Sequence, residues 1–378
     1  MDTVNSHLLD NLGGSALPLT LVRGEGARLW DDQGRVYWDF YGGHAVSLLG
    51  QGHPRWIAAM KAQAEQFTFF STLADLPVRH QAADALCALT GMDVAFFVNS
   101  GAEANEAALK MARKITGRPV IIALEGGFHG RTMGAVGVTW HYRDQHAPAH
   151  GIVRHVPMGD TAALVAALDD QVAGMIAEPV QGIAGVVLPP DGWLAEAAAL
   201  VRAAGGLFIA DEIQSGMGRG GYPLVSRHLG VSPDLATVGK GLGGGFPVAA
   251  TLMTRAVADT VRPGEHGTTF GGAPMACAAV VNTLQILEDE DLIARGRALG
   301  LAMHQALSAV PGVETVRGEG VLIGVALDRP AKPVANALMG LGFIVGTASD
   351  PKVLRLSPPM NTPYEAVDAL AAALKELL

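Results

Sequence analysis

Residues 94–114 have the sequence VAFFVNSGAEANEAALKMARK, an apolar run that leads without a break into an alanine-rich segment. The apolar start predicts a buried strand, and the segment from Ala102 onward predicts a helix. Ser100 and Glu103 have the spacing of a capping box, so we expect the helix to begin at Gly101. A strand followed at once by a helix is typical of a parallel sheet with helices packed on its faces.

The same alternation extends to about residue 253. Further short apolar runs predict strands at 119–123, 175–177, 207–210, 235–238 and 248–253, and helices are expected at 161–168 and 194–204. Strands that alternate with helices build a mostly parallel sheet that is covered on both faces. We therefore predict an α/β fold with one large, mostly parallel sheet.

The pattern changes after Ala273, which predicts a second, smaller domain of the α+β type. One long helix is expected over 274–309, strands at 321–327, 343–345 and 353–356, and a final helix at 363–378. Turn signals such as Gly24–Gly26 predict hairpins near the start of the chain. We expect residues 1–45 to form an N-terminal arm that is part of the small domain, residues 46–256 the large domain, and residues 257–378 the linking helix and the C-terminal small domain.

The composition is that of a folded protein with a large core. At about 150 residues per domain, 378 residues predict two to three domains. A content of 49% hydrophobic and 17% charged residues excludes a disordered chain. The net charge of -9 argues against a partner that is a nucleic acid or an anionic membrane.

Neither a membrane span nor a secretion signal is predicted. No apolar run approaches the roughly 20 residues that a membrane-spanning helix needs. The first residues lack both the positive start and the apolar segment of a signal peptide. With only Cys87 and Cys277, the chain has no disulfide framework, so we expect a cytoplasmic protein.

No metal site is predicted either. The two cysteines do not have the spacing of a zinc-ligand pair. A cluster of histidines, His141, His146, His150 and His155, falls in a stretch that we expect to be a solvated loop, because Pro148 breaks any helical spacing.

Two predicted strand ends carry candidate binding groups. A helix that begins at Gly101 leaves free N–H groups where anions bind readily, although ordinary strand–helix turns share this pattern. Asp211 and Glu212 end the strand at 207–210, and a buried carboxylate there needs a cation or a proton donor. A helix cap or a Mg²⁺ site would also use carboxylates at this point, but the chain has no phosphate-binding Walker loop.

Lys240 is the one lysine among seven that closes an apolar strand. Burial lowers the pKa of a lysine amine, and the neutral amine is a nucleophile that forms a Schiff base with a carbonyl. The alternative is a lysine whose stem lies on the sheet while its amine reaches water. Gly239, Gly241 and Gly244 also match a dinucleotide-binding pattern, but a strand is expected after them in place of the required helix.

Two further segments supply polar groups. In the loop 126–132, Phe128 could stack on a flat ring, and Arg131 could bind a carboxylate or form a surface ion pair. Thr268 and Thr269 could bind a phosphate or merely end a turn.

Together these features are what pyridoxal phosphate requires of a protein, namely an anion-binding helix start, a stacking aromatic ring, a buried Asp211 and a reactive lysine.

The chain resembles the class III (ornithine-type) aminotransferases of fold type I, over nearly its whole length. The motifs that carry the resemblance are NSGAEANEA at 99–107, FHGRT at 128–132, EPVQG at 178–182, DEIQSG at 211–216 and GKGLGGGFP at 239–247. Within the family it is most similar to the branch of acetylornithine and succinylornithine aminotransferases, on the segments 41–46 and 267–272. The resemblance implies a large domain with a mostly parallel sheet and a smaller α+β domain.

The resemblance also implies a role for each site residue. Lys240 would hold pyridoxal 5′-phosphate covalently and later move a proton, and Asp211 would keep its ring nitrogen protonated. The other cofactor-binding residues would be Phe128 and Ile213 on the two faces of the ring, Gln214 at the phenolic oxygen, the amides of Gly101 and Ala102 at the phosphate, and Thr269 from a neighbouring subunit. Substrate would be bound by Arg131, Thr268, Arg355 and Glu178. The implied active form is a homodimer with shared sites.

The expected reaction is transfer of an amino group from N2-acetyl-L-ornithine to 2-oxoglutarate, in arginine biosynthesis. The alternatives are succinylornithine, 4-aminobutyrate or another ω-amine as donor, or an aminomutase or isomerase on the same fold. Gly43 stands where enzymes of free ornithine have a tyrosine, which favours an acylated amine. Ile183 stands where many relatives have a glutamate that masks the second arginine, so we expect Arg355 to be less masked here.

Overall fold

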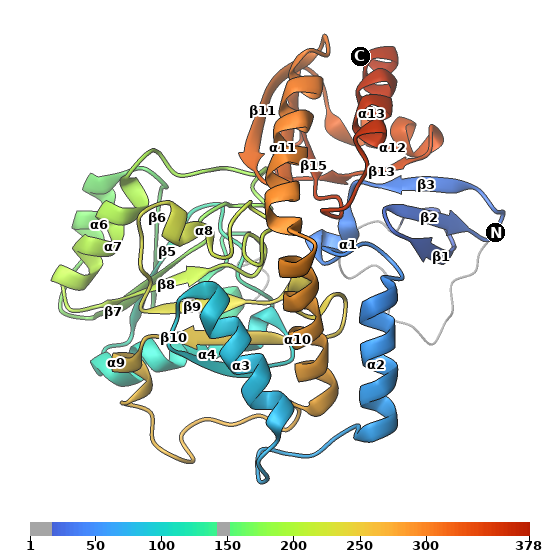
Figure 1. The fold of residues 1–378 in the computed structure, drawn as a ribbon. Helices are drawn as coiled ribbons and strands as arrows, with labels where there is room; N and C mark the ends of the chain where they lie inside the picture. The colour runs from blue at the N-terminus through green and yellow to red at the C-terminus, as the bar shows by residue number, and fades with distance from the viewer. Residues whose placement is uncertain (1–16, 142–151) are drawn as a thin grey trace, which may run out of the picture.

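A computed structural model describes residues 17–141 and 152–378. Its centre is a seven-stranded sheet (Figure 1). In spatial order the strands are β4 (Val94–Val98), β10 (Ala249–Met253), β9 (Leu235–Val238), β8 (Leu207–Asp211), β7 (Val172–Ala177), β5 (Val120–Leu124) and β6 (Val153–Val156). Strands β9, β8, β7, β5 and β6 pair in parallel, whereas β10 runs antiparallel to both β4 and β9. The predicted α/β fold with a mostly parallel sheet is confirmed.

Helices cover both faces of this sheet. The helices between residues 77 and 258 are α3 (Pro77–Thr90), α4 (Gly101–Thr116), α5 (Met133–Val138), α6 (Thr161–Ala167), α7 (Trp193–Ala203), α8 (Val225–His228) and α9 (Arg255–Ala258). The earlier helix α2 (Pro54–Gln66) packs instead on the helix at 274–289. Alternate residues of a strand face opposite sides, so Ile209 packs in the cluster of α4 while Phe208 packs in the cluster of α7. Because both faces are buried, the strands are nearly continuous apolar runs.

The helix expected over 274–309 is two helices, α10 (Pro274–Asp289) and α11 (Leu292–Ser308). The break is at Asp291, whose φ of 46° lies in the left-handed region and cannot continue a right-handed helix. The apolar periodicity continues through the break, which is why the pattern alone predicted one helix.

The prediction of a solvated loop at His155 is wrong, because residues 153–156 form the strand β6. The polar residues Arg154 and His155 interrupt the apolar run, so the pattern did not predict this strand. It is the edge strand of the sheet, where polar and charged side chains are tolerated. The predictions for His146 and His150 lie outside the described residues.

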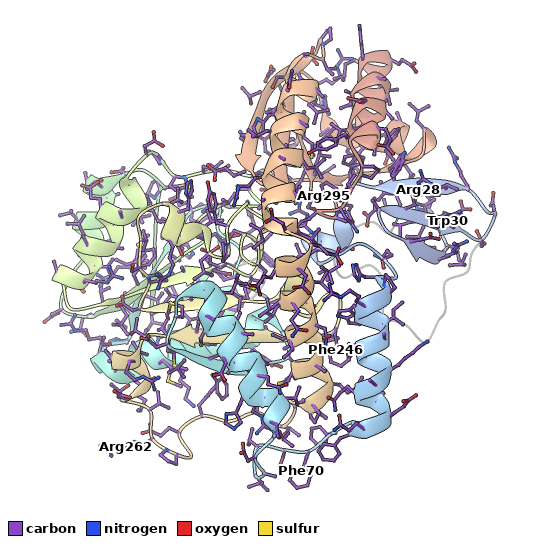
Figure 2. The ribbon with its side chains drawn as sticks, in the orientation of Figure 1. Arg28, Trp30, Phe70, Phe246, Arg262 and Arg295 are labelled. Atoms are coloured by element: carbon purple, nitrogen blue, oxygen red, sulfur yellow. The ribbon has the colours of Figure 1, made fainter. Side chains whose placement is uncertain are left out.

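Two smaller sheets complete the structure. One holds β11 (Val313–Glu319), β12 (Leu322–Leu327), β15 (Val353–Leu356) and β14 (Gly346–Thr347), with α12 (Ala331–Gly340) and α13 (Tyr364–Leu377) beside it. The other holds β1 (Leu21–Glu25), β2 (Arg28–Asp31), β3 (Val36–Asp39) and β13 (Phe343–Ile344). Figure 2 shows Arg28 and Trp30 on β2, well away from the large sheet. Because β3 pairs with β13, the start of the chain is joined to its C-terminal part. The domain boundaries at 45 and 256 stay a prediction.

No helix in the described ranges is long and apolar enough to cross a membrane.

The packing of α11 against the turn between β11 and β12 gives a test of stability. A Cβ atom on Gly300 would lie 1.9 Å from the carbonyl oxygen of Gly320, whereas a Cβ on Gly296 would meet nothing closer than 3.4 Å. We expect Gly300→Ala to lower the free energy of unfolding by about 1–3 kcal/mol through overpacking. In the matched control Gly296→Ala, one turn earlier, we expect no loss, because alanine favours helix by up to about 1 kcal/mol. Urea unfolding of both variants measures the difference, and equal effects would contradict the packing argument.

Candidate active site

Lys240 lies at the carboxyl end of β9, where it begins the short 3-10 helix η2 (Lys240–Gly243). The sequence predicted that it closes the strand, but Val238 is the last residue of β9. The backbone turns sharply here, since Lys240 has a φ of 46° in the region that residues other than glycine avoid. Strain of this kind persists where surrounding packing holds it, and it is common at functional sites.

The Lys240 side chain lines a cavity of about 200 Å³. Removal from water lowers the pKa of its amine, and the negative charges of Asp211 and Glu178 only partly oppose that shift. A lowered pKa leaves more of the amine neutral and therefore nucleophilic at neutral pH.

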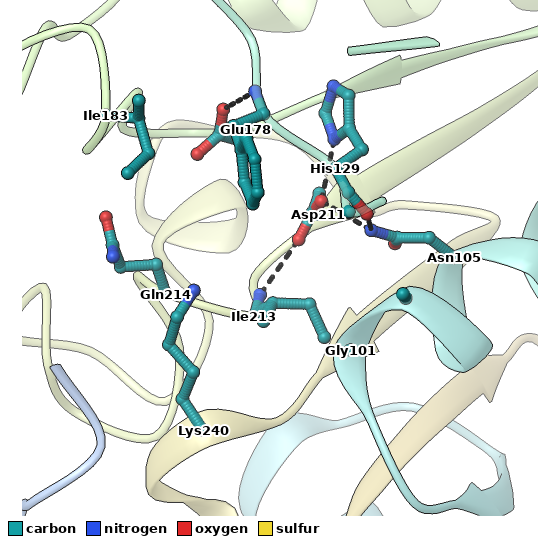
Figure 3. A pocket seen from close by; sticks show the side chains of 12 residues that line it. Gly101, Asn105, His129, Glu178, Ile183, Asp211, Ile213, Gln214 and Lys240 are labelled. Carbon is teal, nitrogen blue, oxygen red and sulfur yellow. Dashed lines mark hydrogen bonds and ion pairs between the residues drawn. The ribbon is translucent and has the colours of Figure 1, made fainter. Parts of the chain in front are cut away.

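Asp211 is the last residue of β8 and lines the same cavity. One carboxylate oxygen lies 2.7 Å from Nδ1 of His129 and accepts a hydrogen bond of 2.8 Å from the Asn105 amide (Figure 3). The other accepts a hydrogen bond of 3.0 Å from the backbone N–H of Ile213. Burial by itself would raise the pKa of Asp211, but the hydrogen bond and positive charge of His129 lower it. Asp211 is therefore ionised although it is only 3% exposed.

The neighbouring Glu212 takes no part in the cavity wall. Its carboxylate accepts hydrogen bonds from the Ser215 hydroxyl, at 2.5 Å, and from the Ser226 backbone, at 2.6 Å. The two adjacent acids of the sequence thus separate, one toward the cavity and one toward the loop that follows it. Among the described residues, no group of three or more His, Cys, Asp or Glu could hold a metal ion.

Three residues of the Asp211 network were not predicted, namely His129, Asn105 and Thr237. The Asn105 amide also donates to the His129 carbonyl, and its own oxygen accepts from the Thr237 hydroxyl. Burial by itself would lower the pKa of His129, but the hydrogen bond and charge of Asp211 outweigh burial and raise it. A signal for Asn105 exists in the sequence, because it is a lone polar residue on the buried, alanine-rich face of α4.

The N-terminus of α4 forms another part of the wall. The helix begins at Gly101, as predicted, and the Ser100 hydroxyl accepts a hydrogen bond of 3.3 Å from the Glu103 backbone. The Glu103 carboxylate binds the N–H of Asn99, one residue before the position that a capping box uses. Gly101 and Ala102 line the cavity. Their N–H groups have no partner within the helix, so this end attracts an anion.

Phe128, Ile213, Gln214 and Glu178 complete the predicted residues in the wall. The Phe128 N–H donates to Glu178 Oε1 at 2.8 Å, and burial raises the pKa of Glu178 to about 7. Gln214 Oε1 is buried without a hydrogen-bond partner among the described residues. A Cβ on Gly182 would lie 1.5 Å from that oxygen, so the glycine is what leaves room for Gln214 in the wall.

Four predicted substrate or cofactor residues lie outside the cavity wall. Arg131 is exposed, with its guanidinium carbon 6.0 Å from the Phe128 ring centroid. Thr268 Oγ1 lies 3.5 Å from the side-chain nitrogen of Asn99, and Thr269 is exposed. Arg355 is buried on β15, and its charge also lowers the pKa of Lys240. Ile183 does line the cavity, close to Glu178 (Figure 3).

The arrangement can bind an anion at α4, keep a carboxylate charged at β8 and offer an amine at β9, all in one cavity. This set of groups fits pyridoxal phosphate, and the unpartnered oxygen of Gln214 is a further polar group in the wall of its site.

Comparison with known proteins gives a consistent result. The family model described as "Aminotransferase class-III" matches residues 11–378. An acetylornithine aminotransferase of Streptomyces coelicolor is 44% identical and covers 98% of this chain and 93% of its own. An acetylornithine aminotransferase of Mycolicibacterium smegmatis is 43% identical over 96% of this chain and 94% of its own. Among solved structures, an ornithine aminotransferase of Toxoplasma gondii is 33% identical with a TM-score of 0.90, over 96% of this chain and 90% of that chain.

The buried pair of His129 and Asp211 predicts a dependence of stability on pH. A histidine whose pKa is raised by folding stabilises the protein below its ordinary pKa, and this contribution is lost as the pH rises through the folded-state value. We expect His129→Gln to lower the unfolding free energy of the cofactor-free protein by about 3 kcal/mol near pH 5.5, and by less near pH 9, because it breaks a buried ion pair.

Urea unfolding at the two pH values measures this difference. His80→Gln serves as the control, because His80 pairs with Asp75 at an exposed position and should contribute little at either pH. A loss in His129→Gln that is as large at the higher pH would contradict the assignment of an ion pair.

Proposed function

The chain belongs to the class III aminotransferases, and we propose that it transfers the terminal amino group of N2-acetyl-L-ornithine to 2-oxoglutarate. The products would be N-acetyl-L-glutamate 5-semialdehyde and L-glutamate. As an aminotransferase of this family, it uses pyridoxal 5′-phosphate. The observation that carries the proposal is that Lys240, the ionised Asp211 and the start of α4 meet in one cavity. The relatives named above support the choice of amine donor.

The cofactor, when bound, supplies an electron-withdrawing ring, and the protein's part is to hold that ring and move protons around it. Lys240 would bind it covalently and carry the proton, and the charged Asp211 would hold the ring nitrogen in its protonated form. Phe128 and Ile213 would flank the ring, and Gln214 would bind its phenolic oxygen. Gly101 and Ala102 would bind its phosphate through their N–H groups. Thr269 would reach the phosphate of a second copy of the chain.

Substrate would be held by its two ends. Arg131 would bind the far carboxylate of the amine donor, with Thr268 and Glu178 beside it, and Arg355 would bind the α-carboxylate of 2-oxoglutarate or glutamate. An arginine at each end suits a reaction in which an amine donor and a dicarboxylate acceptor use the same site in turn. The absence of a tyrosine at Gly43 favours a donor whose α-amino group is acylated.

We further propose that the protein is a cytoplasmic homodimer with shared active sites, and that its reaction belongs to arginine biosynthesis. Thr269 is the residue that a shared site would use, and it is exposed in the single chain.

The first test follows the visible absorption band of the holoenzyme. N-acetylornithine should bleach the band, and 2-oxoglutarate should restore it, because the two half-reactions are complementary. Lys240→Ala should abolish turnover, since no other lysine lines the described cavity. Bleaching by succinylornithine or 4-aminobutyrate but not by N-acetylornithine would show that the amine donor is a different one, while the proposed transamination would stand. Turnover without 2-oxoglutarate, with Arg355 dispensable, would indicate an aminomutase or isomerase, and activity retained in Lys240→Ala would refute the proposal.

Ile183 gives a second test, on the choice between the two substrates. We expect Ile183→Glu to place a carboxylate in the cavity, where it masks Arg355 and disfavours glutamate as an amino donor. The ratio of kcat/KM for acetylornithine over glutamate should rise about tenfold, which corresponds to about 1.4 kcal/mol of transition-state binding. Ile183→Gln is the matched control, because glutamine has nearly the shape of glutamate but carries no charge. An unchanged ratio in Ile183→Glu would show that masking of Arg355 does not set this preference.

A further inference from the structure

The short element α1 (Gly42–Ala45) is a left-handed turn. Its four residues have φ values of 60°, 56°, 61° and 67°. Chains of L-amino acids visit this region as single residues, mostly glycine, and a run of four is rare. His44 and Ala45 are the two residues of the run that carry a Cβ atom and are therefore strained. Backbone strain of this kind is common at functional sites.

Two buried residues, one acidic and one basic, hold the two ends of this turn. At its start, Asp39 Oδ1 accepts hydrogen bonds from the N–H groups of Tyr41, at 3.1 Å, and Gly42, at 2.7 Å. At its end, the Arg219 guanidinium donates to the carbonyls of Ala45, at 3.3 Å, and Ser47, at 3.0 Å. Asp39 is 3% exposed and Arg219 is 1% exposed. Removing two charges from water costs free energy, and hydrogen bonds to the turn offset this cost only in the observed geometry, so these bonds specify the conformation of the turn.

The turn lies against the two cationic residues of the proposed site. It contacts η2, the element that begins with Lys240. The ring of Tyr41 packs on Gly346, where an added Cβ would lie 3.0 Å from Tyr41 Cδ2. Gly346 pairs with Arg355 across β14 and β15. The turn is thus placed near the element of the lysine, and the Tyr41 that precedes it near the strand of the arginine.

Tyr41 and His44 form a hydrogen-bonded pair on this turn. The Tyr41 hydroxyl is 2.6 Å from Nδ1 of His44, and the rings meet edge to face with centroids 4.9 Å apart. Burial, with the positive charges of Arg355 and Lys240, lowers the pKa of His44, which keeps the ring neutral. When the tyrosine hydroxyl donates to Nδ1, the ring proton is on Nε2. A fixed, neutral N–H donor beside an arginine is suited to a carboxylate.

We propose that His44 is a substrate-binding residue whose Nε2–H donates to the carboxylate that Arg355 binds. Tyr41 is a positioning residue that fixes the tautomer and orientation of the imidazole. The ligand class is a dicarboxylate of the size of 2-oxoglutarate or glutamate. The proposal rests on the proposed function for the role of Arg355 as the second carboxylate site.

The variant His44→Gly separates binding from backbone strain. Glycine adopts a φ of 61° freely, so we expect the melting temperature of the holoenzyme to stay within about 2 °C of the original protein. The KM for 2-oxoglutarate should rise about tenfold, the loss expected for one hydrogen bond to a charged group, while kcat and the KM for the amine donor stay within about twofold. Tyr41→Phe should raise the same KM about threefold and leave kcat unchanged, because the imidazole remains but loses its fixed orientation.

Glutarate tests the same contact without turnover. It has both carboxylates of 2-oxoglutarate but no keto group, and its binding is measured by calorimetry on the holoenzyme. Its Kd should rise about tenfold in His44→Gly, and more in Arg355→Ala. If glutarate binding depends on Arg355 and not on His44, the His44 proposal fails and the proposed function stands. If glutarate binding depends on neither residue, the assignment of Arg355 fails as well.

His228→Ala is the matched control, because the His228 ring also packs on a tyrosine ring, Tyr222, at 3.7 Å between ring centroids, while its charged neighbour is Glu319 and not Arg355. This variant should leave both KM values and the Kd for glutarate unchanged. An unchanged KM for 2-oxoglutarate in His44→Gly, or an equal rise for both substrates, would overturn the proposal.

Discussion

The charged state of Asp211 is the constraint on which the active site depends. A carboxylate that is 3% exposed would take up a proton at neutral pH unless its neighbours favour the anion. His129 and the N–H groups of Asn105 and Ile213 do so from three separate segments, namely the loop after β5, the first turns of α4 and the loop after β8. These segments must therefore meet at one point, and the cavity lies beside that point.

The parallel sheet explains why they meet there. The carboxyl ends of neighbouring parallel strands lie along one edge, so loops far apart in sequence are brought together. Gly101 follows β4, Phe128 follows β5, Glu178 follows β7, Asp211 ends β8 and Lys240 follows β9. The antiparallel β10 lies between β4 and β9, and because it is antiparallel to both, those two strands still end at the same edge.

The sequence predicted those parts of the site that depend on local pattern. Strand runs, the helix start at Gly101 and the isolated Lys240 each produce a signal within a few residues. The partners of Asp211 do not, since Asn105 and His129 are separated from it by 106 and 82 residues and are joined only by the fold. The break at Asp291 was missed for a different reason, because a single left-handed residue leaves the apolar periodicity intact. Arg131, Thr268, Thr269 and Arg355 lie outside the cavity wall, and the roles proposed for them depend on a bound substrate or on a second copy of the chain.

The pairing of β3 with β13 also imposes an order on the assembly of the chain. Trp38 and Asp39 are synthesised about 300 residues before Phe343 and Ile344, with which they pair. During synthesis the strands of the large sheet can associate first, while β3 has an unpaired edge until the C-terminal part emerges from the ribosome. Such an edge is a site for pairing with other chains, so β3 is open to aggregation before folding is complete. The left-handed turn beside it also lacks part of its support until then, because the Arg219 that binds the turn is itself held by the Pro358 carbonyl.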